Sequence, residues 1–245
     1  MANWSDPRPR AAPFGAAAGS RTEAYDAGLR SYMLSVYNYM TSGILLTGIV
    51  AMVFASSGYA AQVFTQPGFV KYIIMFAPLA FVFGMSFGQA RMSAVTLQGM
   101  FWGFAVAMGL SLSTIFLQYS ETSIAQAFFA TAAAVAALSL YGYTTKRDLS
   151  VFGTFLIMGV VGLFVASLLN LWFQSGPFAL VISIVGVLLF AGLTAYDTQR
   201  TKAMYAQVAG TADEKRVVIM SALSLYLDFI NMFLFILRIF GSSRS

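Results

Sequence analysis

The chain has 245 residues, of which 59% are hydrophobic and only 9% are charged, and its formal net charge is +5. A soluble domain carries about 25% charged residues, so this composition excludes an ordinary soluble protein and predicts an integral membrane protein. Histidine and cysteine are both absent, which excludes Ser-His catalysis, haem held by histidine, thiolate zinc sites and disulfides.

The first 30 residues differ in kind from the rest. They are rich in Ala, Pro, Gly and Arg and contain no apolar run. They therefore lack the apolar segment of a signal peptide, and we expect a flexible cytoplasmic tail over residues 1–30 followed by one membrane domain over residues 31–245.

Seven apolar runs follow, and at about 1.5 Å per helical residue they are long enough to cross about 30 Å of hydrocarbon. We expect these spans at residues 36–54, 72–87, 95–117, 124–143, 151–173, 178–197 or slightly beyond, and 217–240. The segments between them are short and rich in polar or turn-forming residues. The sequence thus predicts an all-α membrane protein with seven transmembrane helices and no second soluble domain.

Lysine and arginine are distributed unevenly over this arrangement. Eleven fall on the side of the amino terminus, and three, Lys71, Arg238 and Arg244, fall on the other. Because positively charged loops stay in the cytoplasm, we expect a cytoplasmic amino terminus and an external carboxyl terminus. Topology and contact with anionic lipid account for the net charge, which gives no reason to expect a nucleic-acid partner.

Two aspartates lie inside apolar runs, Asp197 in the sixth and Asp228 in the seventh. A carboxylate at membrane depth costs about 2.5 kcal/mol or more on insertion scales, so a functional site is the default hypothesis. The alternative is a carboxylate near a helix end that reaches the headgroups, which fits Asp197 better than Asp228.

Helical spacing places further polar side chains on the same faces as the two aspartates. The stripe on the seventh run comprises Ser221, Ser224, Asp228 and Asn231, and the stripe on the sixth comprises Thr194, Asp197, Arg200 and Thr201. These faces should meet protein or water rather than lipid. For the Ser, Thr and Asn residues taken singly, the alternative is hydrogen bonding between helices.

The two carboxylates should act together if they approach within hydrogen-bond distance. Like charges in a low dielectric do not both ionise easily, so such a pair should hold one proton and titrate as a unit near neutral pH. Asp228 lies about 11 residues, or ~16 Å, beyond the expected start of its helix, whereas Asp197 lies near the end of its own. The two meet only if the sixth helix continues past Arg200 or the seventh begins later.

Several motifs together resemble the Bax inhibitor family of membrane proteins, in a bacterial-type member. They are FAGLTAYDTQ at residues 190–199, SLYGYTTKRD at 139–148, GLSLS at 109–113 and LYLDFINMF at 225–233. The resemblance covers essentially all of the chain after the tail. It implies a bacterial inner membrane protein in which the last helix is surrounded by the other six.

The resemblance also implies a pH-sensitive calcium leak that is gated by an aspartate pair, which Asp197 and Asp228 match. It implies a basic residue on the second helix that latches onto the sixth-helix aspartate. Arg91 is the candidate for this latch, by position more than by motif.

The leading hypothesis is therefore a channel and not an enzyme, with the lipid bilayer and calcium as its partners and no cofactor. Calcium takes oxygen ligands, and Asp197 and Asp228, with flanking Ser, Asn and backbone oxygens, would form a weak, transient metal site that suits conduction.

Two other functions stay open. One is a regulatory membrane protein that binds a membrane protease or a stress complex. The other is an intramembrane aspartyl protease, whose Tyr-Asp motif Tyr196 and Asp197 match. The residues before Asp228 lack the glycines expected there, however, and no Pro-Ala-Leu follows.

Overall fold

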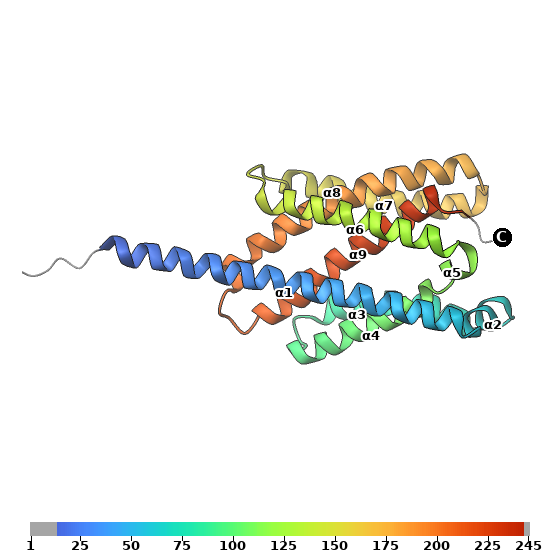
Figure 1. The fold of residues 1–245 in the computed structure, drawn as a ribbon, viewed down its shortest axis with the longest axis horizontal. Coiled ribbons are helices and arrows are strands. Elements are labelled where there is room, and N and C mark those ends of the chain that lie inside the picture. The colour runs from blue at the N-terminus through green and yellow to red at the C-terminus, as the bar shows by residue number, and fades with distance from the viewer. Residues whose placement is uncertain (1–13, 243–245) are drawn as a thin grey trace, which may run out of the picture.

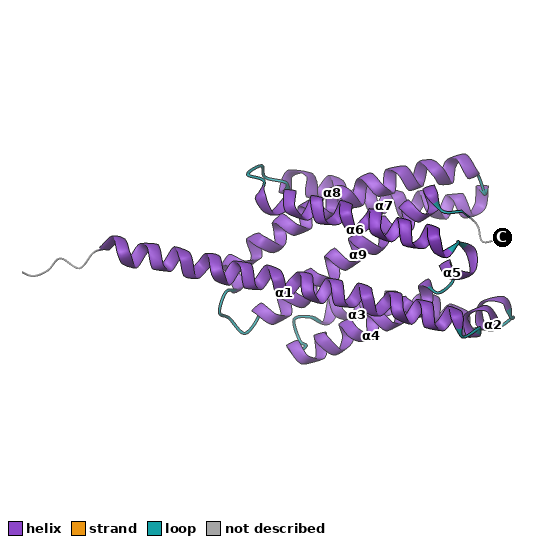
Figure 2. Ribbon diagram, in the orientation of Figure 1, coloured by secondary structure: helices purple, strands orange, loops and turns teal. Residues whose placement is uncertain are grey.

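The computed structural model describes residues 14–242, and within that range it contains helices and no strand (Figures 1 and 2). The helices are α1 (Phe14–Ser56), α2 (Tyr59–Thr65), α3 (Val70–Gly88), α4 (Ala94–Leu112), α5 (Ile115–Gln118), α6 (Glu121–Thr144), α7 (Ser150–Phe173), α8 (Gly176–Val208) and α9 (Glu214–Phe240). Seven segments are long and apolar enough to cross a membrane, with α4 and α5 together forming the third. The predicted all-α fold with seven spans is confirmed.

The third span is interrupted, where the sequence predicted a continuous helix over residues 95–117. Helix α4 ends at Leu112 and α5 begins at Ile115. At the break, the Ser113 hydroxyl donates a hydrogen bond of 2.7 Å to the carbonyl of Leu110. A serine hydroxyl that bonds a nearby carbonyl competes with the helix, and hydropathy alone does not detect such a break.

The first helix begins much earlier than expected. Helix α1 starts at Phe14, so residues 14–30, which were expected to belong to the tail, are helical, and the apolar span within α1 begins at Glu23. The segment is rich in alanine, the best helix former, and the nearby prolines all precede Phe14. Leu29 is already buried. The remainder of the expected tail, residues 1–13, lies outside the described residues.

Helix α9 lies deepest in the bundle. In the most apolar 18-residue stretch of α9, 67% of the residues are buried. The corresponding share for α8, the next most buried span, is 39%. Helix α9 packs directly against α1, α4, α6 and α8, whereas α3 packs mainly on α4 and α7 on α8. Four spans therefore pack closely on the last helix, and the arrangement implied by the resemblance, in which all six surround it, stays a prediction.

A buried hydrogen-bonded cluster joins α9 to its neighbours α1 and α4. The Tyr226 hydroxyl lies 2.7 Å from Thr47 Oγ1, which donates to the carbonyl of Ala105 at 2.8 Å. Because the Thr47 proton goes to Ala105, the Tyr226 hydroxyl is the donor to Thr47. The rings of Phe101 and Phe104 meet the Tyr226 ring edge-on, with centroids 6.3 and 5.0 Å away.

Helices α6 and α8 approach so closely that one position requires glycine. A Cβ atom at Gly142 would collide with the backbone carbonyl of Ala195. Small residues allow membrane helices to pack backbone against backbone in this way. The contact holds α8, which carries Asp197, at a fixed distance from α6.

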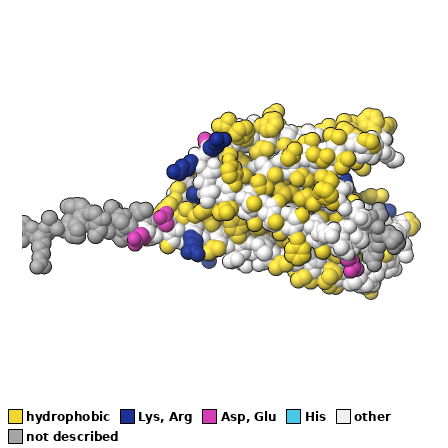
Figure 3. All heavy atoms as spheres, turned by 45° about the horizontal axis from the view of Figure 1, so that its top comes forward, with side chains coloured by type: hydrophobic (Ala, Val, Ile, Leu, Met, Phe, Trp, Pro, Cys, Tyr) yellow, Lys and Arg dark blue, Asp and Glu magenta, His cyan; other side chains and the backbone are white. Residues whose placement is uncertain are grey.

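The two ends of the bundle differ in charge. The loops α3–α4, α6–α7 and α8–α9 lie at the end where α1 enters the bundle, and the carboxyl terminus lies at the opposite end (Figure 1). These loops contain Arg91, Lys146 and Arg147, and α9 starts there with Lys215 and Arg216. Lysine and arginine side chains gather on this side of the molecule (Figure 3), which we call the basic end.

We expect Gly142→Ala to lower the stability of the fold by about 1–3 kcal/mol, because the new methyl group forces α6 away from α8. Thermal unfolding of the purified protein in detergent measures the effect. The matched control is Gly162→Ala in α7, where nothing lies within 4 Å of the added methyl. An equal loss of stability in both variants would contradict the close α6–α8 contact.

The uneven charge predicts that the basic end faces the cytoplasm. A reporter that is active only in the cytoplasm should give a signal when inserted in the loop containing Lys146 and Arg147, and none when fused to the carboxyl terminus. A reporter active only outside the cytoplasm should give the reverse pattern. A cytoplasmic signal from the carboxyl terminus is the outcome that would overturn this orientation.

Candidate functional site

The length of α8 brings the two aspartates to similar depth. The helix continues for 11 residues beyond Asp197 to Val208, and α9 begins 14 residues before Asp228 at Glu214. Measured from the α8–α9 turn, Asp197 therefore lies at about 16 Å and Asp228 at about 21 Å. The sequence required α8 to continue past Arg200 for the pair to meet, and the structure meets that condition.

The two carboxylates are neighbours that do not bond to each other directly. They lie close enough to interact electrostatically, but the hydrogen bonds formed by the described residues include none between them. Asp228 is only 4% exposed, and Asp197 is partly buried. The direct contact that would let them share one proton through a hydrogen bond is thus not formed in this conformation.

Asp197 lines a cavity of about 240 Å³ between α8, α9 and the end of α3. The lining consists of Gln89, Asp197, Arg200, Thr201, Met204, Val217, Met220, Ser221 and Ser224. Most of these residues lie between the aspartates and the basic end. Asp228 is not part of the lining, so it lies behind the cavity and out of contact with it.

The basic residue beside Asp197 in this conformation is Arg200, and the described residues form no ion pair between Arg91 and Asp197. Arg200 lines the same cavity and interacts electrostatically with Asp197. Arg91 follows the end of α3, in the turn before α4, where its side chain is exposed. Among the described residues the ion pair is that of Arg216 with Asp213. Because α3 ends at Gly88, it carries Gln89 toward the cavity but leaves Arg91 outside.

Three buried oxygens around the site lack a hydrogen-bond partner in the part of the chain that the structure describes. They are Asp228 Oδ2, Ser221 Oγ and the hydroxyl of Tyr32. The Tyr32 hydroxyl on α1 lies near that of Ser221 on α9, without forming a hydrogen bond of normal geometry. Buried polar atoms are nearly always paired, so such a group marks a place for water, a proton or an ion.

The other predicted stripe residues separate into two groups. Ser221, Ser224, Arg200 and Thr201 line the cavity with Asp197. Thr194 and Asn231 do not line it. They donate to carbonyls of their own helices, those of Phe190 and Leu227, at 2.8 Å. Their bonds run within one helix, whereas the alternative interpretation expected bonds between helices.

Sequence reasoning missed Gln89 and Tyr32. Gln89 follows the second apolar run and resembled an ordinary loop residue. Tyr32 lies in the segment expected to be outside or at the edge of the first span, and it is one of 12 tyrosines. No spacing distinguished it from the others.

The described residues contain no group of three or more His, Cys, Asp or Glu side chains that could hold a metal ion. In this conformation a cation in the cavity would meet one carboxylate, that of Asp197, together with hydroxyl and backbone oxygens. Such a set is weak compared with the six to eight oxygens of a dedicated calcium site.

The fold and the site define a class: a seven-span helical membrane protein whose last two helices place one carboxylate in a cavity and a second, buried carboxylate behind it. A family model described as Inhibitor of apoptosis-promoting Bax1 matches residues 29–245. The chain belongs to this family, the Bax inhibitor family, as its motifs indicated.

Three bacterial proteins of similar length are among its relatives. The inner membrane protein YbhL of Escherichia coli is 45% identical over 221 residues, covering 89% of this chain and 94% of the relative. An uncharacterized protein of Rickettsia prowazekii is 44% identical over 92% of this chain and 95% of its own. An uncharacterized membrane protein of Streptococcus pyogenes is 36% identical over 88% and 94%.

Proposed function

We propose that the protein is a pH-sensitive calcium leak pathway in a bacterial inner membrane, gated by Asp197 and Asp228. The observation that carries this proposal is the unpartnered, buried Oδ2 of Asp228 beside a second carboxylate that lines a cavity. A carboxylate oxygen without a partner at this depth is costly. We therefore infer that Asp228 binds a proton or a cation during transport.

The arrangement suits a permeant cation better than a resident one. Calcium accepts carboxylate, hydroxyl and backbone oxygens at flexible distances, and conduction requires a site that the ion can leave again. The cavity supplies one carboxylate and the hydroxyls of Ser221, Ser224 and Thr201. The second carboxylate lies deeper, and at 4% exposure it has no access to the cavity. In this proposal the conformation is the closed one.

Proton coupling follows from the same pair. Two like charges that lie close together away from water do not both ionise easily, so the pair takes up and releases a proton as a unit. Each proton changes the charge that the cation meets. It also changes the attraction between Asp197 and Arg200, which lie one turn apart on α8. Proton uptake can thereby select one of two arrangements of the helices.

The geometry does not favour an intramembrane aspartyl protease. Such an enzyme needs both carboxylates at the substrate, whereas the cavity reaches Asp197 and not Asp228. Its volume of about 240 Å³ is also below the range of about 300–1,000 Å³ typical of sites for small ligands, and a peptide is larger still.

We expect calcium entry into proteoliposomes to change between about pH 6 and 8, because uptake of a proton by one of two neighbouring carboxylates changes the charge that the cation meets. Asp228→Asn should lower the flux about tenfold, equivalent to about 1.4 kcal/mol of lost cation attraction, and flatten the pH profile. Asp197→Asn should mainly flatten the profile. The measurement is dye-reported calcium entry across pH for the wild type and both variants.

The matched control for this experiment is Asp148→Asn. Asp148 is an exposed carboxylate in the α6–α7 loop, and hydrogen bonds from Ser150 hold its pKa below the usual range. It stays ionised across the assayed range, so the control should leave both flux and profile unchanged. If both site variants kept the wild-type pH profile, the aspartates would be structural, and a protein that binds a membrane protease or stress complex would be the better proposal.

We further expect Arg200→Gln to raise the resting calcium flux, because it removes the positive charge beside Asp197. The effect should be about fivefold, as for a partly buried interaction of about 1 kcal/mol. Arg91→Gln serves as the matched control, since its side chain is exposed outside the cavity. A rise in flux for Arg91→Gln alone would restore Arg91 as the latch and identify the structure as a different state of the gate.

A further inference from the structure

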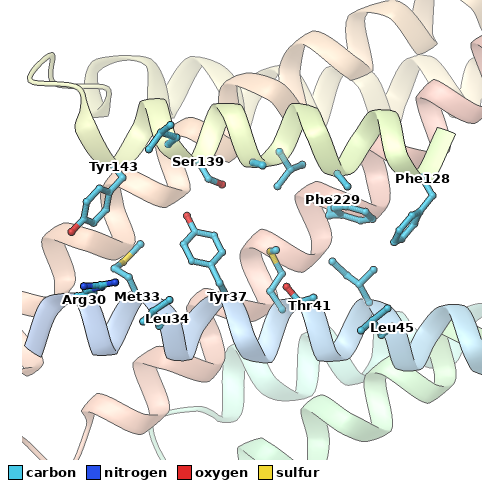
Figure 4. Close-up of a pocket in the computed structure, with 16 residues that line it drawn as sticks. Arg30, Met33, Leu34, Tyr37, Thr41, Leu45, Phe128, Ser139, Tyr143 and Phe229 are labelled. Carbon is cyan, nitrogen blue, oxygen red and sulfur yellow. The ribbon is translucent and has the colours of Figure 1, made fainter. Parts of the chain in front are cut away.

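A second and larger cavity lies on another side of α9, between α1 and α6. Its volume is about 760 Å³, and Figure 4 shows the residues that line it. Helices α1 and α6 both pack on α9, but they are not among the helix pairs in close contact with each other. The lining is mainly apolar and includes Leu34, Met40, Ile44, Leu45, Phe128 and Ala132.

The cavity continues along the span as a groove. A neighbouring cavity of about 850 Å³ shares Ile44, Leu45 and Phe128 with it and extends to Ser56 and Glu121. These two residues lie where α1 ends and α6 begins, at the end opposite to the basic end. The groove therefore follows the membrane normal over most of the span, as an acyl chain does.

The basic end of the groove carries positive charge. Arg30 lines the groove and is exposed, and among the described residues no carboxylate forms an ion pair with it. Tyr143 reaches from α6 toward Arg30 (Figure 4). Lys202 donates to the carbonyl of Tyr143 at 2.8 Å, and its Nζ lies 4.5 Å from the centroid of that ring. Arg30 is thus the cation of the lining, and Lys202 lies behind Tyr143 as a second one outside the lining.

Hydroxyl groups line the groove deeper in the membrane than Arg30. Tyr37 lies seven residues after Arg30, or about 10 Å deeper along α1, and points toward Ser139 of α6 (Figure 4). Its hydroxyl is 3.4 Å from Thr198 Oγ1, which is also 3.4 Å from Ser139 Oγ. Beyond Met40 the lining of the first cavity is apolar apart from Thr41, and the rings of Phe128 and Phe229 meet with centroids 5.5 Å apart.

We propose that this groove binds one anionic glycerophospholipid, with its phosphate at Arg30 and an acyl chain along Ile44, Leu45 and Phe128. Cationic, hydroxyl-bearing and apolar surfaces follow one another in the order of the phosphate, glycerol and acyl parts of such a lipid. Basic pockets between transmembrane helices are known to hold anionic headgroups. A partner helix would not require positive charge at one end and hydroxyls below it.

Native mass spectrometry of the full chain tests the proposal, after extraction from vesicles of equal phosphatidylglycerol and phosphatidylethanolamine. The wild type should retain one phosphatidylglycerol. Arg30→Gln should lower the preference for phosphatidylglycerol about fivefold, the effect of one basic residue at an anionic surface. Ala136→Trp places a large side chain in the groove and should abolish retention of the lipid.

Each variant has a matched control that keeps its chemistry but moves it out of the groove. Arg91→Gln removes an exposed arginine at the same end of the bundle, and Ala133→Trp enlarges an exposed alanine of α6 that does not line the groove. Both controls should retain phosphatidylglycerol as the wild type does. Thermal unfolding checks the fold of all four variants, and because Arg30 is exposed, its variant decides the question even if Ala136→Trp unfolds.

Three results would overturn the proposal. The first is an equal loss of preference in Arg30→Gln and Arg91→Gln, which would indicate general attraction to surface charge. The second is unchanged lipid retention in a folded Ala136→Trp variant. The third is a lipid-free dimer for the wild type and a monomer for Ala136→Trp. This result would assign the groove to a second copy of the chain.

Discussion

The structure depends on shielding one carboxylate from lipid. Asp228 lies in the interior of a span, where a charged or even a polar group is costly in hydrocarbon. The chain meets this constraint by enclosing α9 between α1, α4, α6 and α8. The Tyr226 hydroxyl, bonded to Thr47, and the rings of Phe101 and Phe104 fix α9 only two residues before Asp228. The contacts that position the last helix are thus also those that keep its aspartate away from lipid.

Hydropathy was sufficient to predict the spans because each must cross the bilayer as an apolar helix whose backbone hydrogen bonds are satisfied internally. Six of the seven expected spans lie within structural helices with the same order and connections. The aspartates were also recognisable, since a carboxylate in an apolar run is conspicuous. Their proximity was not, because it depends on α8 continuing through the polar residues after Asp197.

The errors share a physical origin. The start of α1 and the break after α4 depend on local helix propensity and on one serine hydroxyl, which a hydropathy average does not contain. That Arg200 and not Arg91 lines the cavity with Asp197 depends on where α3 ends and in which direction each side chain points. The groove between α1 and α6 is a property of helix spacing, and its residues resemble any other apolar face in the sequence. Positions along a helix were predictable, whereas relations between helices were not.

The length of α8 has a consequence for the membrane around the protein. At 33 residues the helix is about 50 Å long, whereas the hydrocarbon layer is about 30 Å thick. Because α8 begins directly after a short turn from α7, the surplus projects at the basic end. Asp197 lies 21 residues from Gly176, or about 32 Å, which is close to the level where hydrocarbon gives way to headgroups. A thicker bilayer would draw this carboxylate into hydrocarbon, and a thinner one would hydrate it. The thickness of the host membrane therefore influences whether the carboxylate at the cavity is charged.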